Sequence, residues 1–423
     1  MVAAPSSGAG KTTVTLGLLR ALRRHGVALA PAKAGPDYID PRFHEIAAGA
    51  PCVNLDPWAM SNNRLRALTD GPGTLVVEAA MGLFDGAADG TGSAADLAAV
   101  LGLPILLVVD AARQSHSVAA LVHGFSTWRD DVRVAGILLN RVGSERHERM
   151  LRDALATTNV PVLGALRRDT TLTVPERHLG LVQAAENLEL ESLIERAADA
   201  VECGFDLSAI SSLAIEADGM GASAPRPRLP PLGQRIAVAR DIAFAFAYPH
   251  MLDDWHAQGA EIRPFSPLAD EVPDDTCDAV FLPGGYPELH AGQLSAAERF
   301  RDGLHRARDR GALIYGECGG YMALGEVLTD ADGVGHVMAG LLPAETSFAD
   351  RSLHLGYRRA RPLGTGPFGD VPLNGHEFHY ASVVREGNPL FAVSDAQGHQ
   401  LAPTGSRADR VMGSFVHVVD RAA

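Results

Sequence analysis

The chain has 423 residues, of which 46% are hydrophobic and 21% charged, and its formal net charge is -14 at pH 7. Its length predicts two or three domains, and its composition is that of a soluble globular protein. Nucleic-acid binding and docking on anionic lipid both need a basic surface, so the acidic balance argues against nucleic-acid and membrane partners.

The first stretch, residues 2–13, reads V-A-A-P-S-S-G-A-G-K-T-T and predicts a strand, a glycine-rich turn and a helix start. In a phosphate-binding loop, backbone N–H groups close on a triphosphate, a lysine reaches the outer phosphates and a hydroxyl holds Mg²⁺. The strict pattern has glycine at the place of Pro5, but the strand before and the helix after support the same interpretation. The expected ATP-binding residues are Gly8, Ala9, Gly10, Lys11, Thr12 and Thr13, with Thr12 also a ligand of Mg²⁺.

Apolar strands alternate with helical stretches as far as about residue 193. The first helix is expected over residues 14–25, where apolar residues recur at helical spacing before Gly26. Strands are expected over residues 2–4, 27–34, 75–78, 104–110, 134–140 and 160–166. This alternation predicts an α/β fold whose first domain is a doubly wound parallel sheet with a P-loop.

Acidic residues at strand ends are candidates for this site, because ligands bind at the carboxyl edge of an open parallel sheet. Glu78 closes an apolar strand, where phosphate-loop enzymes hold Mg²⁺ with an acid; the alternative is a surface carboxylate. Asp85 lies in a glycine-bounded turn and is expected at Mg²⁺, phosphate or substrate, against a role in the turn alone. Asp110 stays undecided between Mg²⁺ and helix capping.

The second strand and the loop after it add further candidates. Lys33 is expected to give the transferred phosphoryl group a second positive charge, with a surface lysine as the alternative. Asp37 or Asp40 is expected at the site, since residues 35–41 contain two prolines and a glycine and form a loop. Asn140 is expected to hydrogen-bond the adenine edge, with helix capping as the alternative.

Residues 219–233 contain four prolines and suit neither a helix nor a central strand, so they predict a linker between domains 1–218 and 234–423. Beyond it, strands are expected over residues 236–239, 261–264, 279–282 and 312–315, with helices near 244–258 and 296–310. The second domain is therefore also α/β, with more antiparallel strands late in the chain. No internal repeat is visible.

Cys318 stands between a strand and a helix in G-E-C-G-G, which is the spacing of a nucleophile elbow. Small neighbours allow the strained turn, and the helix N-terminus favours a thiolate and an oxyanion. A small buried hydrophobe is the usual fate of a free cysteine, but it does not explain the flanking glycines. Gly285, after another strand, and Gly319 are the expected oxyanion donors.

A cysteine nucleophile needs a base, and His417, near the chain end, is the best candidate. His376 and His379 compete with it, but they lie in an expected strand and face opposite sides. The segment is one residue short of the H-E-x-x-H zinc motif. A substrate contact or a packed histidine is therefore expected there rather than a metal ligand.

The four cysteines, Cys52, Cys203, Cys277 and Cys318, are scattered and include no C-x-x-C pair. This argues against a disulfide scaffold or structural zinc and suits a reducing cytosol. No signal-peptide pattern precedes the first strand, and no apolar run approaches the about 20 residues of a membrane span. A cytoplasmic protein is expected.

Nine short motifs, taken in order, cover nearly the whole chain: A-P-S-S-G-A-G-K-T-T, G-P-D-Y-I-D-P, V-N-L-D, M-G-L-F-D-G, L-N-R-V-G-S-E-R-H, E-R-H-L-G-L-V, L-P-G-G-Y-P-E, G-E-C-G-G-Y-M and G-H-E-F-H-Y. With them the chain resembles the cobyrinate-type glutamine amidotransferase family, that of the cobyrinic and hydrogenobyrinic acid a,c-diamide synthases. The resemblance implies an N-terminal ATP-binding synthetase domain similar to dethiobiotin synthetase. It also implies a C-terminal class I-like glutamine amidotransferase domain.

Carried over residue by residue, the resemblance implies Cys318 as the glutaminase nucleophile and His417 as its base. Ordinary class I triads have a glutamate two residues after the histidine, where this chain has Val419. The cobyrinate branch lacks that acid, which leaves the orientation of His417 unexplained.

In the first domain the resemblance implies Glu78 as a ligand of Mg²⁺. It assigns Asp37, Tyr38 and Asp85 to the substrate and the activated intermediate. The first strand is short for the family, so the natural start is expected to lie upstream.

The implied reaction uses a corrinoid, ATP and L-glutamine. ATP with Mg²⁺ phosphorylates a peripheral acetate, and ammonia from glutamine converts the acyl phosphate into an amide at positions a and c. Whether the corrinoid contains cobalt stays open, with a preference for metal-free hydrogenobyrinate, and a homodimer is allowed. One alternative is cobyric acid synthase chemistry on other carboxylates. Another is a partitioning-type nucleotide-switch ATPase with an inactive amidotransferase tail, against which Ser6 stands where those proteins carry a signature lysine.

Overall fold

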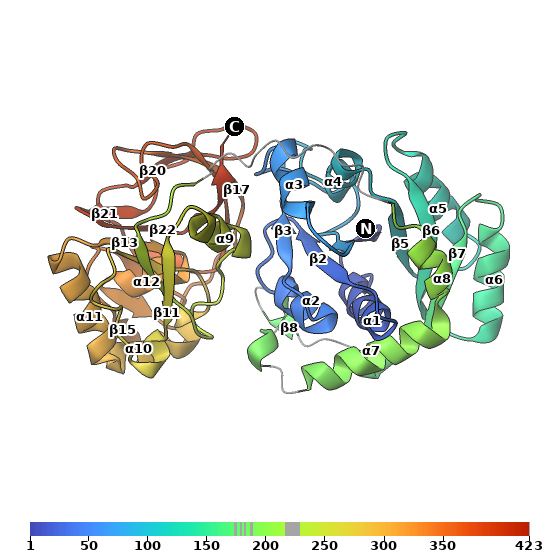
Figure 1. Ribbon diagram of the computed structural model, residues 1–423, viewed down its shortest axis with the longest axis horizontal. Coiled ribbons are helices and arrows are strands. Elements are labelled where there is room, and N and C mark those ends of the chain that lie inside the picture. The colour runs from blue at the N-terminus through green and yellow to red at the C-terminus, as the bar shows by residue number, and fades with distance from the viewer. Residues whose placement is uncertain (173–175, 178–179, 182, 187–188, 216–228, 423) are drawn as a thin grey trace. The chain divides into compact units, whose positions relative to one another are not determined.

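The computed structural model describes residues 1–172, 176–177, 180–181, 183–186, 189–215 and 229–422. Contacts within the chain divide it into two compact units, Met1–Pro225 and Arg226–Ala423 (Figure 1). The expected linker lies outside the described residues except for 229–233, and so does part of the motif that begins at Glu176. Within the second unit, Leu229 and Leu232 are buried, and the Leu229 carbonyl accepts a hydrogen bond from Gln258.

The first unit is built on a seven-stranded sheet in the order β3-β2-β4-β1-β5-β6-β7. Every neighbouring pair in it is parallel, as the alternation of strands and helices predicted. The strands are β1 (Val2–Ala3), β2 (Leu29–Ala34), β3 (Val53–Leu55), β4 (Thr74–Glu78), β5 (Ile105–Asp110), β6 (Val134–Val142) and β7 (Val162–Arg167). Two further strands, β8 (Glu176–Arg177) and β9 (Gly180–Leu181), pair with each other.

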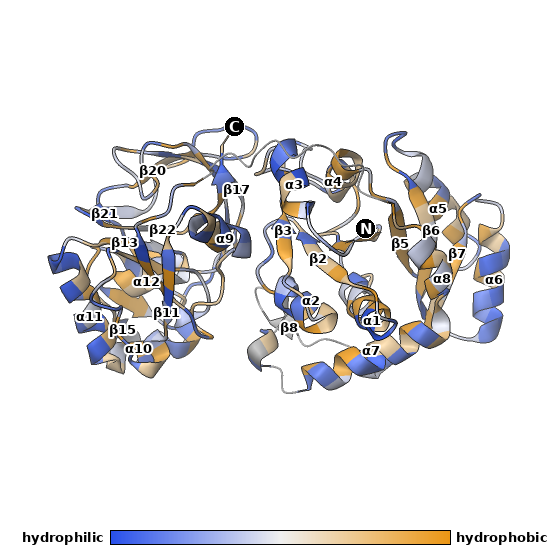
Figure 2. Cartoon of the chain, in the orientation of Figure 1, coloured by the Kyte–Doolittle hydropathy of each residue, from blue (hydrophilic) through white to orange (hydrophobic). Residues whose placement is uncertain are grey.

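Helices cover this sheet because each buries an apolar stripe and leaves charged residues outside. Figure 2 shows the contrast between the hydrophobic strand β2 and the largely hydrophilic α6. Helix α1 packs against α2 and α7, α3 packs against α4, and α5 against α6. The bounds are α1 (Lys11–Arg24), α2 (Asp40–Ala48), α3 (Asn62–Thr69), α4 (Ala94–Leu101), α5 (Val118–Thr127), α6 (Glu145–Leu155), α7 (Leu190–Gly204) and α8 (Leu207–Ser212).

The second unit contains a six-stranded sheet in the order β11-β10-β12-β13-β22-β21, parallel except for the pair β21–β22. Two four-stranded sheets follow, in the orders β15-β14-β16-β19 and β20-β17-β18-β23, and most of their pairs are antiparallel. The expected antiparallel character late in the chain is therefore confirmed. The first seven strands are β10 (Arg235–Ala239), β11 (Glu261–Phe265), β12 (Ala279–Leu282), β13 (Leu313–Glu317), β14 (Val327–Thr329), β15 (Gly335–Val337) and β16 (Glu345–Ser347). The remaining seven are β17 (His354–Pro362), β18 (Leu373–His379), β19 (Ser382–Arg385), β20 (Phe391–Ser394), β21 (Ser406–Ala408), β22 (Val411–Ser414) and β23 (His417–Arg421).

Two expected helices of the second unit have other bounds. The helix expected near residues 244–258 begins only at Pro249, because the residue before a proline avoids the helical region and Tyr248 is extended. The helix expected near 296–310 is α11 (Glu298–Asp309), and α10 (Ala291–Ala296) precedes it. Helix α9 (Pro249–Ala257) and the short α12 (Gly319–Leu324) complete the set. Within the described ranges, no helix combines the length and the apolar character needed to cross a membrane.

The sequence also missed strand β3 (Val53–Leu55) as an element, because its length of three residues is too short for any periodicity. Its register is set by β2, with Asn54 opposite Lys33. The pairing matters for the site below, since it brings the V-N-L-D motif beside the loop that follows β2.

Candidate active sites

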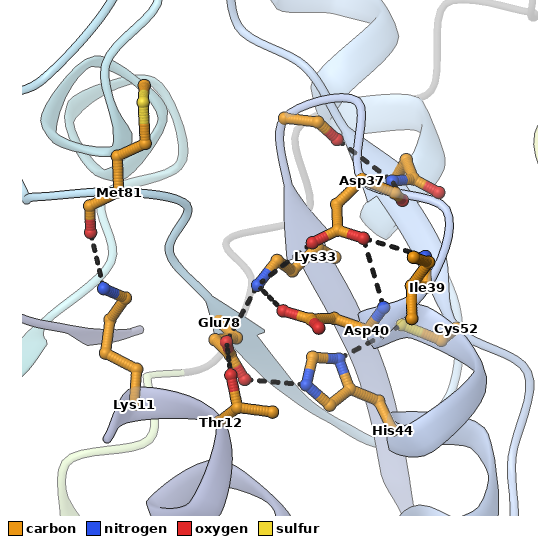
Figure 3. Close-up of polar contacts among 12 residues, drawn as sticks. Lys11, Thr12, Lys33, Asp37, Ile39, Asp40, His44, Cys52, Glu78 and Met81 are labelled. Carbon is orange, nitrogen blue, oxygen red and sulfur yellow. Dashed lines mark hydrogen bonds and ion pairs between the residues drawn. The ribbon is translucent and has the colours of Figure 1, made fainter. Parts of the chain in front are cut away.

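The phosphate loop between β1 and α1 has the backbone that its glycines predict. Gly8 and Gly10 have φ angles of 76° and 86°, which L residues rarely adopt. The ammonium group of Lys11 donates to the Met81 carbonyl at 2.6 Å (Figure 3). It also donates to the Ser6 carbonyl at 3.3 Å. Burial lowers the pKa of Lys11, while Glu78 opposes this shift. The lysine is therefore held at the mouth of the loop by neutral carbonyls that a phosphate can replace.

The ends of β5 and β6 brace the loop from the other side. The amide of Asn140 donates to the Ala9 carbonyl at 2.9 Å and fills the space that a Cβ at Gly10 would need. Arg141 donates to the Gly8 carbonyl at 2.8 Å and to Asp110 at 2.6 Å. Asn140 thus braces the nucleotide loop, and its expected contact with the adenine edge stays a prediction. Sequence reasoning missed Arg141, although a cation directly after a polar strand end was a usable signal.

Asp110 also accepts a hydrogen bond from the Ala112 N–H at 2.9 Å, so both of its oxygens have protein partners. Of the two roles left open for Asp110, this geometry is that of a turn-capping carboxylate. The Thr13 hydroxyl donates to the Leu172 carbonyl at 3.2 Å, so it fixes the start of α1 to a neighbouring turn. Among the expected loop residues, Thr12 is the one whose hydroxyl reaches the strand-end acids.

Glu78 is the centre of the polar cluster in Figure 3. It is 1% exposed, and its Oε1 accepts from the Thr12 hydroxyl at 2.9 Å and from Lys33 at 2.8 Å. His44 Nε2 lies 2.7 Å from Oε2. Burial alone would raise the pKa of Glu78, but Lys33 and His44 lower it below its usual range. Glu78 is therefore an ionised buried carboxylate, already oriented by three neighbours.

Lys33 joins Glu78 to the loop after β2. Its ammonium group is hydrogen-bonded to Asp40 and lies 3.8 Å from Asp37. Burial would lower the pKa of Lys33, but Asp40 and Glu78 raise it well above its usual value. Burial and the nearby Asp37 raise the pKa of Asp40 to about 7. The alternative of a surface lysine is thus excluded, because Lys33 is 3% exposed and lies at the centre of an ion-pair network.

Asp37 has a second task in this loop. Its Oδ1 accepts from the N–H groups of Ile39 at 2.8 Å and Asp40 at 3.1 Å, which fixes the start of α2. Tyr38 is half-buried beside it. Asn54, which sequence reasoning did not single out, donates to the Asp37 carbonyl at 2.6 Å and the Gly35 carbonyl at 3.0 Å. The loop is therefore shaped before any ligand binds.

Asp85 lies in the exposed turn after β4, and its Oδ2 accepts from the Gly82 N–H at 2.9 Å. This hydrogen bond stabilises the turn, which is the alternative role considered for Asp85 in the sequence. The same turn includes Met81, whose carbonyl holds Lys11 and whose φ angle of 52° is strained for a non-glycine residue. Asp85 is consequently part of the turn whose Met81 carbonyl contacts Lys11.

His44 and Cys52 were missed as neighbours of this cluster. His44 follows Asp40 by four residues on α2, so both share one helix face, and this spacing was the available signal. Its Nδ1 lies 3.8 Å from the Cys52 thiol. The chain has only two lysines, Lys11 and Lys33, and both are in this one region while every other basic side chain is arginine or histidine.

In the second unit, Cys318 occupies a strained turn between β13 and α12. Its φ of 45° and ψ of −102° are rare for an L residue, and its N–H donates to the Ser414 carbonyl at 2.8 Å. The side chain is 2% exposed. Burial raises the pKa of the thiol, Glu288 adds to the shift, and the Gly319 N–H opposes it. The resting cysteine is therefore a thiol that needs a base.

Glycines are required around this turn because backbones approach closely. A Cβ on Gly319 would lie 2.9 Å from the Gly285 nitrogen, and one on Gly320 would lie 1.9 Å from the Leu282 carbonyl oxygen. A Cβ on Gly285 would lie 2.0 Å from the Ala243 carbonyl oxygen. The structure thus brings together the two residues expected to donate to an oxyanion.

His417 begins β23 and is 1% exposed. Its ring abuts Gly284, where a Cβ would come within 2.2 Å of Cε1. Burial, together with His376 and His379, lowers the pKa of His417 well below its usual value. The imidazole is therefore neutral and able to accept a proton. Glu317 Oε2 lies 3.9 Å from its Nδ1, a contact that sequence reasoning did not foresee.

The competing histidines have other surroundings. The ring of His379 stacks on Phe415 with centroids 3.9 Å apart, and its Nδ1 lies 3.0 Å from the Ala381 carbonyl oxygen. Burial lowers the pKa of His379 to about 3. His376 meets Tyr357 edge to face at 5.6 Å. Within the described part of the chain, no group of three or more His, Cys, Asp or Glu side chains could hold a metal ion.

Comparison with known proteins assigns both units. A family model described as a CobQ/CobB/MinD/ParA nucleotide binding domain matches residues 1–182, and one described as a CobB/CobQ-like glutamine amidotransferase domain matches residues 235–422. A hydrogenobyrinate a,c-diamide synthase of a Sinorhizobium species is 61% identical over 99% of this chain and 98% of the relative. Those of Brucella anthropi and Mesorhizobium japonicum are 60% and 52% identical over 99% and 100% of this chain and 98% of each relative.

Proposed function

The chain belongs to the family of hydrogenobyrinate a,c-diamide synthases, and on that premise we propose that it amidates the a and c acetate side chains of this corrinoid. ATP activates each carboxylate, and glutamine supplies each nitrogen. One observation carries the proposal: the same chain holds a phosphate loop whose Thr12 meets Glu78 and a strained Cys318 in its second unit. Amide formation from glutamine needs both parts.

The second unit releases ammonia. Cys318 attacks the side-chain amide of glutamine while His417 takes the thiol proton, and the N–H groups of Gly285 and Gly319 receive the oxyanion. The leaving nitrogen takes the proton from His417 and departs as ammonia, which leaves a glutamyl thioester. Water hydrolyses the thioester to glutamate and restores the thiol. The raised pKa of Cys318 and the lowered pKa of His417 indicate that the thiol and the imidazole are both neutral before glutamine arrives.

The first unit binds ATP. The triphosphate is assigned to the loop residues and to Lys11, and Asn140 is assigned to the nucleotide because it braces the same loop through Ala9. Lys33 carries a buried positive charge toward the transferred phosphoryl group. The complete assignment is Gly8, Ala9, Gly10, Lys11, Thr12, Thr13 and Asn140.

Mg²⁺ fits the oxygens of Thr12 and Glu78, which lie 2.9 Å apart and belong to the residue types that Mg²⁺ prefers. Such ions take one or two protein oxygens and complete their shell with phosphates and water, so no larger protein cluster is needed. When bound, Mg²⁺ neutralises phosphate charge. Lys33 and His44 keep Glu78 ionised for that purpose.

The corrinoid carboxylate is assigned to the loop after β2 and the turn after β4, through Asp37, Tyr38 and Asp85. Lys33 lies between this loop and Glu78, which supports transfer of the phosphoryl group at that point. The carboxylate oxygen attacks the terminal phosphorus and ADP leaves. Ammonia then attacks the acyl carbon, phosphate leaves, and an amide forms. Two cycles give the a,c-diamide.

The test is a side-by-side assay of hydrogenobyrinate and cobyrinate with ATP, Mg²⁺ and glutamine, read by product mass. The proposal expects two added amides on hydrogenobyrinate and a lower rate on the cobalt form. Amidation of other carboxylates would identify cobyric acid synthase chemistry. ATP hydrolysis without glutaminase activity would identify a nucleotide switch.

The two lysines offer a direct probe of the nucleotide site. An amine-specific reagent should modify Lys11, whose lowered pKa favours the reactive neutral amine, and ATP with Mg²⁺ should protect it in peptide mass spectra. The buried, ion-paired Lys33 should react far more slowly. Modification that ATP does not slow would refute the assigned phosphate contact. The exposed Arg146 is a matched target for an arginine reagent and should not be protected.

We also place the reaction in the cytoplasm, with partners limited to the three substrates and neither nucleic acid nor membrane. Four free cysteines, one of them exposed, support a reducing compartment. A homodimer is compatible with the family. Light scattering on the purified protein measures that state directly.

A further inference from the structure

His417 lacks the acid that usually orients a catalytic histidine. The position two residues later is Val419, whose side chain is buried and whose carbonyl oxygen lies 2.9 Å from His250 Nε2. A histidine that accepts a thiol proton at Nε2 must carry its own proton at Nδ1, and a partner at Nδ1 selects that tautomer. Some other group must therefore face Nδ1.

Glu317 is in that place. Its Oε2 lies 3.9 Å from His417 Nδ1, and each side chain is 1% exposed. Its Oε1 accepts a hydrogen bond from the Val418 N–H at 3.2 Å, which fixes the carboxyl group beside the start of strand β23. The distance of 3.9 Å exceeds a hydrogen bond, and burial raises the pKa of Glu317 to about 8, but catalytic contacts often shorten once substrate binds.

Two backbone contacts hold the same arrangement. Strands β13 and β22 pair in parallel with Glu317 opposite Ser414. The next residue, Cys318, donates its N–H to the Ser414 carbonyl at 2.8 Å. His417 follows Ser414 by three residues. The carboxyl group and the thiol therefore come from the end of β13, and the imidazole comes from the start of β23, three residues after the end of β22.

The other acids near Cys318 are placed differently. Glu377 is paired with Arg358, with 2.7 Å between Oε2 and Nε. Glu288 lies in the turn Pro287–His290 and acts on the Cys318 thiol through its charge. Glu317, by contrast, lies 3.9 Å from His417 Nδ1.

We propose that Glu317 is the positioning residue of the glutaminase site, the acid that holds Nδ1–H of His417 so that Nε2 faces the thiol. The inference rests on the proposed roles of Cys318 and His417. The acid thus comes from the residue directly before the nucleophile instead of the residue two places after the base. Glu317 does not touch glutamine; it acts through His417 alone.

The test is Glu317→Gln, which keeps the shape of the side chain and an oxygen for the Val418 N–H but cannot ionise. Expected is a fall in kcat for glutamine hydrolysis of up to about 10⁴-fold, the loss found when the acid of a serine-protease triad is replaced, with KM nearly unchanged. Amidation driven by free ammonia should continue at the wild-type rate. Glu317→Asp, which keeps the charge on a shorter side chain, should recover part of kcat.

The matched control is Glu386→Gln. Glu386 is another partly buried acid of the same unit, but it accepts from the Tyr321 hydroxyl at 3.0 Å and the Gly405 N–H at 2.9 Å. The kcat of Glu386→Gln for glutamine hydrolysis should stay at the wild-type level. Thermal unfolding of both variants separates lost positioning from lost folding. A glutamine-analogue diazoketone that alkylates Cys318 should react more slowly in Glu317→Gln than in the control.

A wild-type kcat in Glu317→Gln, beside an inactive Cys318→Ala, would overturn the inference and leave the proposed function intact. Glutaminase activity in Cys318→Ala would overturn the proposed function itself. If Glu317→Gln does not fold, Glu317→Asp decides: unchanged kcat and unchanged labelling of Cys318 would contradict the positioning role.

Discussion

The two candidate sites differ most in their charge. Around Glu78 in the first unit, charges are present before any ligand binds, because Lys33 and His44 hold the carboxylate ionised. Around Cys318 in the second unit, burial raises the pKa of the thiol and lowers that of His417, so both groups rest neutral.

The proposed function explains this difference by the ligand that each site would bind. A triphosphate with Mg²⁺ arrives charged, and oriented charges in a buried site meet it without reorganisation. Glutamine presents a neutral amide, so charge is needed only once the thiol attacks. The comparison teaches that burial serves both sites in opposite ways: it strengthens existing ion pairs in one and suppresses ionisation in the other.

The largest expected effect separates the two sites. Cys318→Ala should lower glutaminase activity and glutamine-dependent amidation by about 10⁵-fold or more, as loss of a covalent nucleophile does elsewhere. Amidation with free ammonia should persist, because the first unit is untouched. Cys277→Ala, which removes another buried cysteine of the same unit, is the control and should keep both reactions. Loss of the ammonia reaction in Cys318→Ala would contradict a division of labour.

Lys11→Ala should impair the nucleotide site around Glu78 and leave the glutaminase site around Cys318 active. Amidation with either nitrogen source should fall by about 10²–10³-fold, since one positive contact to the phosphates is lost. Glutamine hydrolysis by the second unit should remain measurable. Arg146→Ala removes an exposed cation of the same unit and serves as the control. Unchanged amidation in Lys11→Ala would refute the phosphate role.

Gly320→Ala tests the close approach that shapes the neutral site. The added Cβ would lie 1.9 Å from the Leu282 carbonyl oxygen, so the start of α12 must shift. We expect a loss of about 1–3 kcal/mol in the free energy of unfolding, together with reduced glutaminase activity. Gly335→Ala, on β15, meets only a side-chain carbon at 3.4 Å and should be nearly neutral. Equal unfolding curves for the two variants would argue against tight packing at this turn.

The smallest expected effect is the contribution of the buried His379 to the pH dependence of the free energy of unfolding. Its folded pKa of about 3 lies below the usual value of 6.5, so the unfolded chain binds the proton first. Stability is therefore complete above about pH 6.5 and falls as the pH decreases, by about 2 kcal/mol between pH 7 and 5 from this group. Denaturant unfolding at both pH values should show a weaker pH dependence in His379→Gln. Exposed His399 replaced by Gln should leave the wild-type slope, and identical slopes in all three proteins would show that His379 titrates normally.

Much of the fold was predictable because its signals are local. Parallel strands buried on both sides read as unbroken apolar runs, and β5 and β6 have that character. The sequence did not predict β3, because three residues are too few to show a periodicity. It placed the start of α9 too early, because the helix begins only at Pro249. The antiparallel sheets were expected only in outline, since pairing across long separations leaves little trace in a single sequence.

The phosphate loop and the strained cysteine turn follow from chain-local chemistry. Each needs a particular backbone within a few residues, and glycine, lysine, threonine and cysteine at fixed spacing are what such backbones require. The remaining contacts are formed only by the tertiary structure. His44 contacts Glu78, and Arg141 donates to the Gly8 carbonyl. Glu317 lies 3.9 Å from His417, although the two residues are 100 positions apart in the sequence. Contacts of this kind depend on sheet order and register, and a carboxylate next to a cysteine has no distinguishing pattern until β13 and β22 pair. The sequence alone identified the candidate site residues, whereas sheet order and register determined which residues contact them.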